Sequence, residues 1–61
     1  MDIRYTATRA ARLSAILKED MNLSTGLMNK LKWDDRLLVN GQPQHTDFPV
    51  QANDIVTVLL D

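Results

Sequence analysis

Two arginines and two hydroxyl residues are the side chains whose types and spacing could do chemistry here. Arg9 and Arg12 are three residues apart near the start of a predicted helix, and Ser24 and Thr25 stand at the start of a second one. Guanidinium groups, hydroxyls and the free N–H groups of a helix start all donate hydrogen bonds to phosphate oxygens. A helix start also disfavours nearby cations unless an anion is bound. These residues therefore predict a site for a phosphate backbone, with two solvated surface arginines as the alternative.

Further cations follow along the second helix. Lys30, Lys32 and Arg36 could widen the patch, but Asp34 and Asp35 lie beside them and would repel phosphate. Mixed charges of this kind are more typical of a salt-bridged surface, which is the favoured interpretation.

The remaining polar and aromatic residues predict no catalytic or metal site. His45 is the single histidine and the chain has no cysteine, so neither nucleophile activation nor a metal-ligand cluster is supported. The Asp34-Asp35 pair fits turn chemistry at a helix end better than acid–base work. Trp33 could stack on a base, but a lone tryptophan is more often a core or rim residue. We therefore predict no catalytic residues, no metal and no cofactor.

Length and charge restrict the class of protein. The 61 residues predict a single domain, residues 1–61, with a small core. The formal net charge of −1 gives no global attraction to nucleic acid, so any affinity must come from a local patch. The longest apolar run, residues 55–60, is too short to span a bilayer, and the N-terminus has no signal-peptide core. A soluble cytoplasmic protein without membrane contact is expected.

Two helices are predicted in the first half of the chain. Residues 3–6 alternate as a short strand does, and residues 9–20 have a helical pattern with Thr8 as N-cap. Ser24 is predicted to cap a second helix, with Leu23 packing on Met28 as a hydrophobic staple. This helix is expected to end near residues 33–35, where an aspartate must take any left-handed conformation because no glycine is present.

The second half predicts strands and turns. Residues 37–39 form a strand, Asn40-Gly41 suits a type I′ hairpin turn, and Pro43 limits the returning strand to a short edge segment. Residues 45–49 are predicted to be a loop, residues 53–54 a turn, and residues 55–60 a strand of β-branched and apolar residues. The predicted fold class is α+β, with two consecutive helices packed on a small antiparallel sheet.

The combined spacing resembles the α-L RNA-binding domain, the fold named after a small-subunit ribosomal protein, number four of its set. Ser24, Leu31 and Val39-Asn40-Gly41 keep the register of that family, and Asn53-Asp54 before an apolar strand is similar to its closing Gly-Asp. Arg12-Leu13 and Leu17 are similar to the family's Arg-Leu-Asp-x-x-Leu, with Ser14 replacing the aspartate. The resemblance covers most of residues 9–58.

Within that family the strand-like N-terminus looks most like the N-terminal domain of bacterial large-subunit rRNA pseudouridine synthases. The resemblance implies that the chain binds structured RNA, with rRNA as the expected target, and guides a catalytic domain of the same protein. The catalytic His-Arg-Leu-Asp segment of such isomerases does not occur here, so this chain is not expected to be an enzyme. The RNA-contacting residues expected on this basis are Arg9, Arg12, Ser24, Thr25, Asn29 and Lys30.

Departures from the family pattern lower the expected affinity. Thr25 replaces the arginine that follows the serine, and Asn29 replaces an often basic residue, so two phosphate contacts are weakened. Asp35 replaces the glycine that ends the second helix, and Lys32 replaces an aliphatic residue. Two alternatives stay open: a free-standing RNA-binding protein, and a protein-interaction module that docks on its own catalytic domain through an apolar strand edge.

Overall fold

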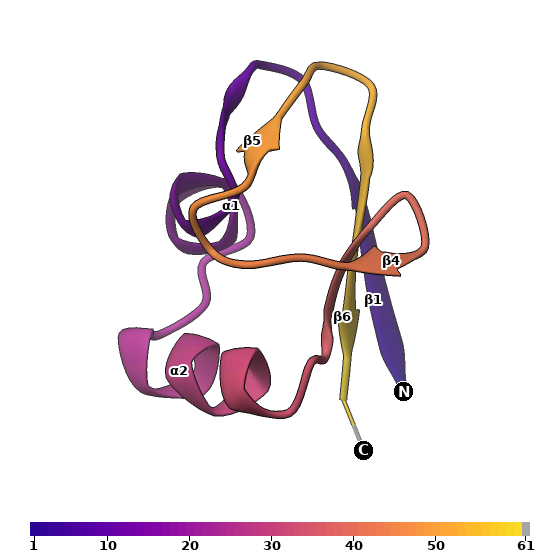
Figure 1. Cartoon of the computed structure of the whole chain (residues 1–61). Helices are drawn as coiled ribbons and strands as arrows, with labels where there is room; N and C mark the ends of the chain where they lie inside the picture. Colours follow the sequence, from indigo (N-terminus) through magenta and orange to yellow (C-terminus); the bar gives the residue numbers. More distant parts are fainter. Residues whose placement is uncertain (61) are drawn as a thin grey trace.

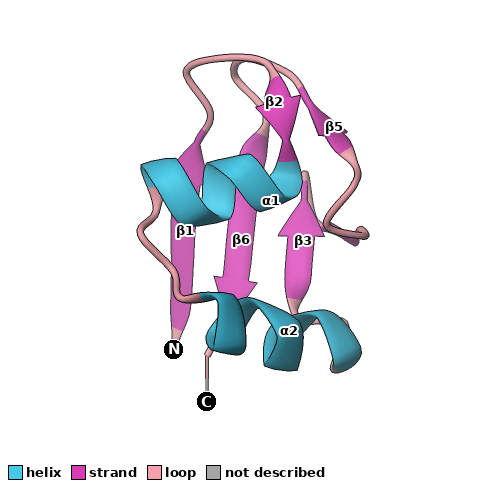
Figure 2. Cartoon of the chain, turned by 90° about the vertical axis from the view of Figure 1, so that its left-hand side faces the viewer, coloured by secondary structure: helices cyan, strands magenta, loops and turns pink. Residues whose placement is uncertain are grey.

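The computed structural model describes residues 1–60 as a small α+β unit, with an antiparallel sheet on one side and short helices on the other (Figures 1 and 2). The elements follow one another in this order: β1 (Asp2–Thr6), β2 (Ala11–Arg12), α1 (Leu13–Ala15), η1 (Ile16–Asp20), α2 (Thr25–Trp33), β3 (Leu37–Val39), β4 (Gln42–Pro43), β5 (Pro49–Val50) and β6 (Ile55–Leu59). The predicted fold class is confirmed at this level.

The main sheet has four antiparallel strands in the order β1-β6-β3-β4. The central strand β6 pairs with β1 along its whole length, from Asp2 opposite Leu59 to Thr6 opposite Ile55. On its other side β6 pairs with β3, which turns back into β4. The first and last strands are therefore neighbours, and Met1 lies beside Leu60, with which it exchanges backbone hydrogen bonds.

The core lies between this sheet and the helices. Val56 and Val58, on one face of β6, are completely buried, whereas Ile55 on the opposite face is 46% exposed. The buried apolar residues come from every layer: Ala7, Leu13, Ile16, Leu17, Met28, Leu31, Leu37, Val39, Val50, Val56 and Val58.

The first helix begins later than predicted. Residues 9–12 are not helical: Arg12 is extended, with φ −65° and ψ 149°, and the helix starts at Leu13 without a side-chain cap. The predicted N-cap Thr8 and a helical Arg9 are therefore wrong. The N–H groups of Leu13 and Ser14 instead donate to the carbonyls of Phe48 (2.9 Å) and Thr46 (2.9 Å), far along the chain.

The five residues of η1 continue α1 with wider turns. The N–H of Met21 donates to the carbonyl of Ile16 at 3.0 Å, the five-residue spacing of a π-helix. Asn22 then takes a left-handed φ of 61°, a conformation that ends helices and that asparagine tolerates.

The second helix matches its prediction at both ends. Ser24 is the N-cap, and its Oγ accepts the N–H of Leu27 at 3.1 Å. At the other end Asp35 is left-handed, with φ 55°. The N–H of Asp35 donates to the carbonyl of Lys32, and the N–H of Arg36 to that of Leu31, the paired bonds of a Schellman motif in which aspartate replaces glycine.

The hairpin and the small second sheet complete the fold. Asn40 and Gly41 both have positive φ, 53° and 84°, which confirms the predicted tight turn between β3 and β4. The strand β5 was not predicted, because residues 45–49 were expected to be a loop. It pairs Val50 with Ala11 of β2, and this non-local pairing keeps residues 11–12 extended.

Candidate nucleic-acid interface

The polar side of α2 holds three of the six candidate residues. Thr25 and Asn29 are four residues apart and therefore lie one above the other on the helix, with Lys30 beside them, and all three are exposed. The opposite side of the helix buries Met28 and Leu31 in the core. This packing fixes which side of α2 faces solvent.

The start of α2 is open to a ligand. Ser24 is exposed, and its hydroxyl already caps the helix by accepting the N–H of Leu27. A Cβ added at Gly26 would meet no atom within 4 Å, so there is free space beside the first turn. The N–H groups of Thr25 and Gly26 are first-turn donors without intrahelical partners, and the oxygens of a phosphate could accept hydrogen bonds from them.

Arg9 is already engaged by carboxylates. Its Nη2 lies 3.1 Å from Oδ1 of Asp20 and 3.3 Å from Oε1 of Glu19. The hydrogen bond from Arg9, followed by that from the Tyr5 hydroxyl at 3.0 Å, lowers the pKa of Asp20 from its usual 3.8. A phosphate at Arg9 would have to compete with two carboxylates.

Arg12 is exposed but lies apart from Arg9. It immediately precedes α1, whereas Arg9 is bound to residues at the end of η1. Figure 2 shows that α1 and α2 run in opposite directions, so the end of η1 lies toward the start of α2 and Arg12 does not. The expectation that Arg9 and Arg12 form a pair within one helical turn, beside the start of the second helix, is therefore wrong.

Of the two structural roles favoured from sequence for Trp33, core or rim, the core role is wrong. Trp33 is 80% exposed at the end of α2, eight residues after Thr25 and on the same side of the helix. The Nζ of Lys32 lies 5.8 Å from the centroid of the indole, within the range of a cation–π contact. No sequence pattern distinguishes an exposed tryptophan from a packed one at this position.

Mixed charges follow Trp33, as predicted. Nε of Arg36 lies 3.9 Å from Oδ2 of Asp34, a long, partly exposed ion pair that contributes little to stability.

Within residues 1–60, no three His, Asp or Glu side chains gather where they could hold a metal ion. None of the helices in that part of the chain has the length and apolar character that crossing a membrane requires.

The ion pair between Arg9 and Asp20 predicts a specific response to acid. Because the folded state lowers the pKa of Asp20, the stabilisation is complete above the usual value of 3.8 and is lost as the pH falls through the lower folded pKa. We expect Asp20→Asn to be less stable than wild type at neutral pH and to lose less stability on acidification. Urea unfolding followed by circular dichroism at neutral and acid pH measures both effects. Glu19→Gln is the control, since the Glu19 side chain is 69% exposed; an equal acid response in the two variants would contradict the role given to Asp20.

No protein-family model matches this chain, and neither a curated protein nor a solved structure matches it significantly.

Proposed function

We propose that this chain is an α-L type RNA-binding domain that guides a pseudouridine synthase domain of the same protein to structured rRNA. The observation that supports the proposal is the place in the fold of three features that carry the resemblance. Ser24 caps a helix, Leu31 lies on its buried side, and Asn40-Gly41 turns the following hairpin, which leaves Thr25 and Asn29 facing solvent.

The proposed contacts are electrostatic and local. The start of α2 supplies N–H donors, and Lys30 and Arg12 supply charge without a carboxylate partner among residues 1–60. Arg9 contributes less, because Asp20 and Glu19 occupy its guanidinium group. With a net charge of −1, binding is weak and depends on salt rather than on base sequence.

Titration of an rRNA hairpin at several salt concentrations tests the proposal. If Lys30 and Arg12 each neutralise a phosphate, Lys30→Gln and Arg12→Gln should each reduce the slope of log affinity against log salt by about 0.7 to 0.9. Arg9→Gln should change it less. Trp33 is the only tryptophan and shares the exposed side of α2, so its fluorescence reports binding there.

Arg4→Gln is the matched control, because it removes the same charge from the face of the sheet opposite the helices. It should leave the slope unchanged. Equal affinity and equal slope for wild type and all four variants would reject the RNA proposal.

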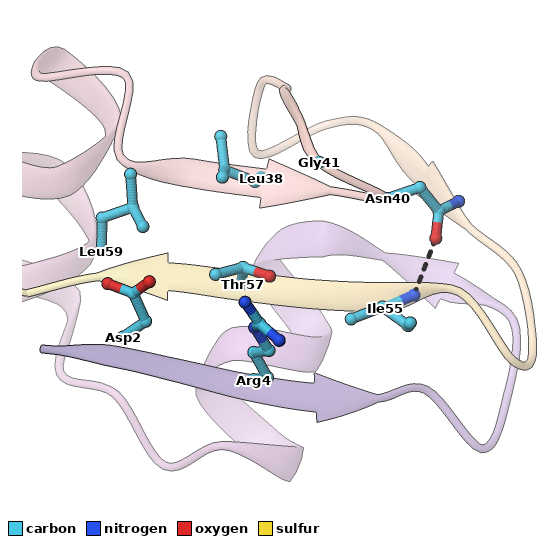
Figure 3. Close-up of a pocket in the computed structure, with 8 residues that line it drawn as sticks. All are labelled: Asp2, Arg4, Leu38, Asn40, Gly41, Ile55, Thr57 and Leu59. Atoms are coloured by element: carbon cyan, nitrogen blue, oxygen red, sulfur yellow. Dashed lines mark hydrogen bonds between the residues drawn. The ribbon is translucent and has the colours of Figure 1, made fainter.

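The second candidate function is a protein-interaction module docking on its own catalytic domain. It is favoured by the outer face of the sheet, where a shallow hollow of about 450 Å³ is lined by residues including Leu38, Ile55 and Leu59 (Figure 3). Failure of the RNA titration would make this surface the leading candidate for function.

A further inference from the structure

The two edges of the main sheet differ in how they are protected. The β4 edge is only two residues long and includes Pro43, which has no N–H to offer another strand. The β1 edge is five residues long and contains neither proline nor lysine. An edge of this length without proline can accept a further strand if the charges of the two strands are complementary.

The hydrogen bonds of β1 show which backbone groups are free. Met1 and Leu60 exchange bonds of 2.6 and 2.7 Å, and the N–H of Ala7 donates to the carbonyl of Asp54 at 2.8 Å. Hydrogen-bonded and non-hydrogen-bonded residue pairs alternate along antiparallel strands. The backbone N–H and C=O groups of the odd-numbered residues of β1 therefore point toward β6. The N–H and C=O groups of the even-numbered residues, Asp2, Arg4 and Thr6, therefore point away from the sheet.

The side chains along this edge are both apolar and charged. On the helix-covered face, Ile3 is 37% exposed although its neighbour Val58 is completely buried, and Met1 is 82% exposed. Figure 3 shows Asp2 and Arg4 on the other face, at the outermost strand. Among residues 1–60 neither Asp2 nor Arg4 has an ion-pair partner.

We propose that β1 binds β1 of a second copy of this chain, antiparallel and centred on Ile3. In this register Asp2 of each copy lies opposite Arg4 of the other. The free backbone groups of Asp2 and Arg4 then form hydrogen-bonded pairs, and the two Ile3 side chains meet where facing side chains approach most closely. The sheets of the two copies join into one.

Charge selects this register over its neighbours. Centring the pair on Arg4 also aligns the free backbone groups, but it places the two guanidinium groups opposite each other, and centring it on Asp2 does the same with two carboxylates. Like charges directly opposite each other destabilise a strand pair, whereas opposite charges stabilise it. The sequence Asp2-Ile3-Arg4 is thus complementary to itself when one strand is reversed.

The interface is small. A strand of five residues buries much less than the roughly 1,200 to 2,000 Å² of a stable complex, so the association is weak and depends on concentration. It is independent of the proposed RNA contacts, which lie on α2 and at Arg12.

Charge exchange between two variants tests the proposal, with sedimentation equilibrium up to millimolar protein as the measurement. Arg4→Asp places two aspartates on one chain and Asp2→Arg places two arginines on the other. Each variant alone should self-associate about tenfold more weakly than wild type, because two attractive pairs become repulsive. A 1:1 mixture of the two variants, and the double variant Asp2→Arg/Arg4→Asp, should recover the association.

Circular dichroism checks that each variant stays folded, as expected for two exposed residues. In wild type, NMR should show the amide resonances of Asp2 and Arg4 moving with concentration more than those of Ile3 and Tyr5. A monomeric wild type at millimolar concentration would overturn the proposal. So would equal recovery when Arg4→Asp is mixed with wild type and with Asp2→Arg, since in the register centred on Arg4 the new aspartate faces Arg4 of either partner.

Discussion

Leu13→Ala is expected to leave much of the protein unfolded at room temperature. Leu13 is completely buried at the first position of α1, within a core of few residues. Truncating a buried leucine costs about 2 to 5 kcal/mol, because apolar contacts are lost and a cavity remains. The total stability of a domain of this size is roughly 3 to 9 kcal/mol, so one truncation removes a large part of it.

Urea denaturation followed by circular dichroism measures this loss. Ile55→Ala is the matched control, since Ile55 is 46% exposed on the outer face of the sheet and should cost less than about 1 kcal/mol. If the urea midpoint of Leu13→Ala is no lower than that of Ile55→Ala, at equal slopes, then packing of Leu13 in the core does not contribute the stability expected of it.

Local signals in the sequence were sufficient for α2 and the hairpin. Ser24 identifies the helix start because its hydroxyl bonds a backbone N–H three residues away, and Asn40-Gly41 identifies the turn because both residues tolerate positive φ. Even the left-handed conformation of an aspartate at the end of α2 could be predicted, because no glycine is present there to take it. In each case the cause and its effect lie within a few residues.

The start of the first helix could not be predicted in the same way. Its first N–H groups bond to the carbonyls of Thr46 and Phe48, and β5 holds Ala11 extended, so residues more than thirty positions away decide where it begins. The helical sequence pattern alone predicted a start at Arg9, because Thr8 before it is a residue type that caps helices.

The carboxylate partners of Arg9 could not be predicted for a similar reason. Thr25, Asn29 and Lys30 all lie on α2, and the helical pattern of that segment was enough to predict that the three side chains are exposed. The partners of Arg9 come from the end of η1, and only the folded chain brings Asp20 to within 3.1 Å of it. An arginine's availability depends on such distant carboxylates, which the spacing of cations does not reveal.

The side chain of Asn40 joins the hairpin turn to the turn that precedes β6. Its replacement should have the second-largest effect on the free energy of unfolding. Its Oδ1 accepts the N–H of Ile55 at 2.9 Å (Figure 3), and its Nδ2 donates to Oδ1 of Asp54 at 3.1 Å. Asp54 in turn accepts the N–H of Gln51 at 2.9 Å. The backbone of Asn40 is left-handed as well, with φ 53°.

Two substitutions separate these contributions. Asn40→Ala removes the side-chain bonds and also places a Cβ residue without a polar group in the left-handed region, so we expect a loss of about 2 kcal/mol. Asn40→Gly removes the same bonds but adopts positive φ without strain, and should lose only about 1 kcal/mol. Urea midpoints at constant slope give both values, and equal losses for alanine and glycine would show that the left-handed backbone costs nothing here.

Asn40→Asp isolates the contact with Asp54. Aspartate tolerates the left-handed backbone and can still accept the N–H of Ile55, but it brings a second carboxylate against Asp54. In wild type the N–H of Gln51 and then the Asn40 amide lower the pKa of Asp54 from its usual 3.8, so wild-type stability falls as acid protonates this group. The variant should instead gain stability relative to wild type on acidification, because protonating either carboxylate removes their repulsion. A constant difference between the two proteins from neutral to acid pH would show that the amide of Asn40 has no part in holding Asp54.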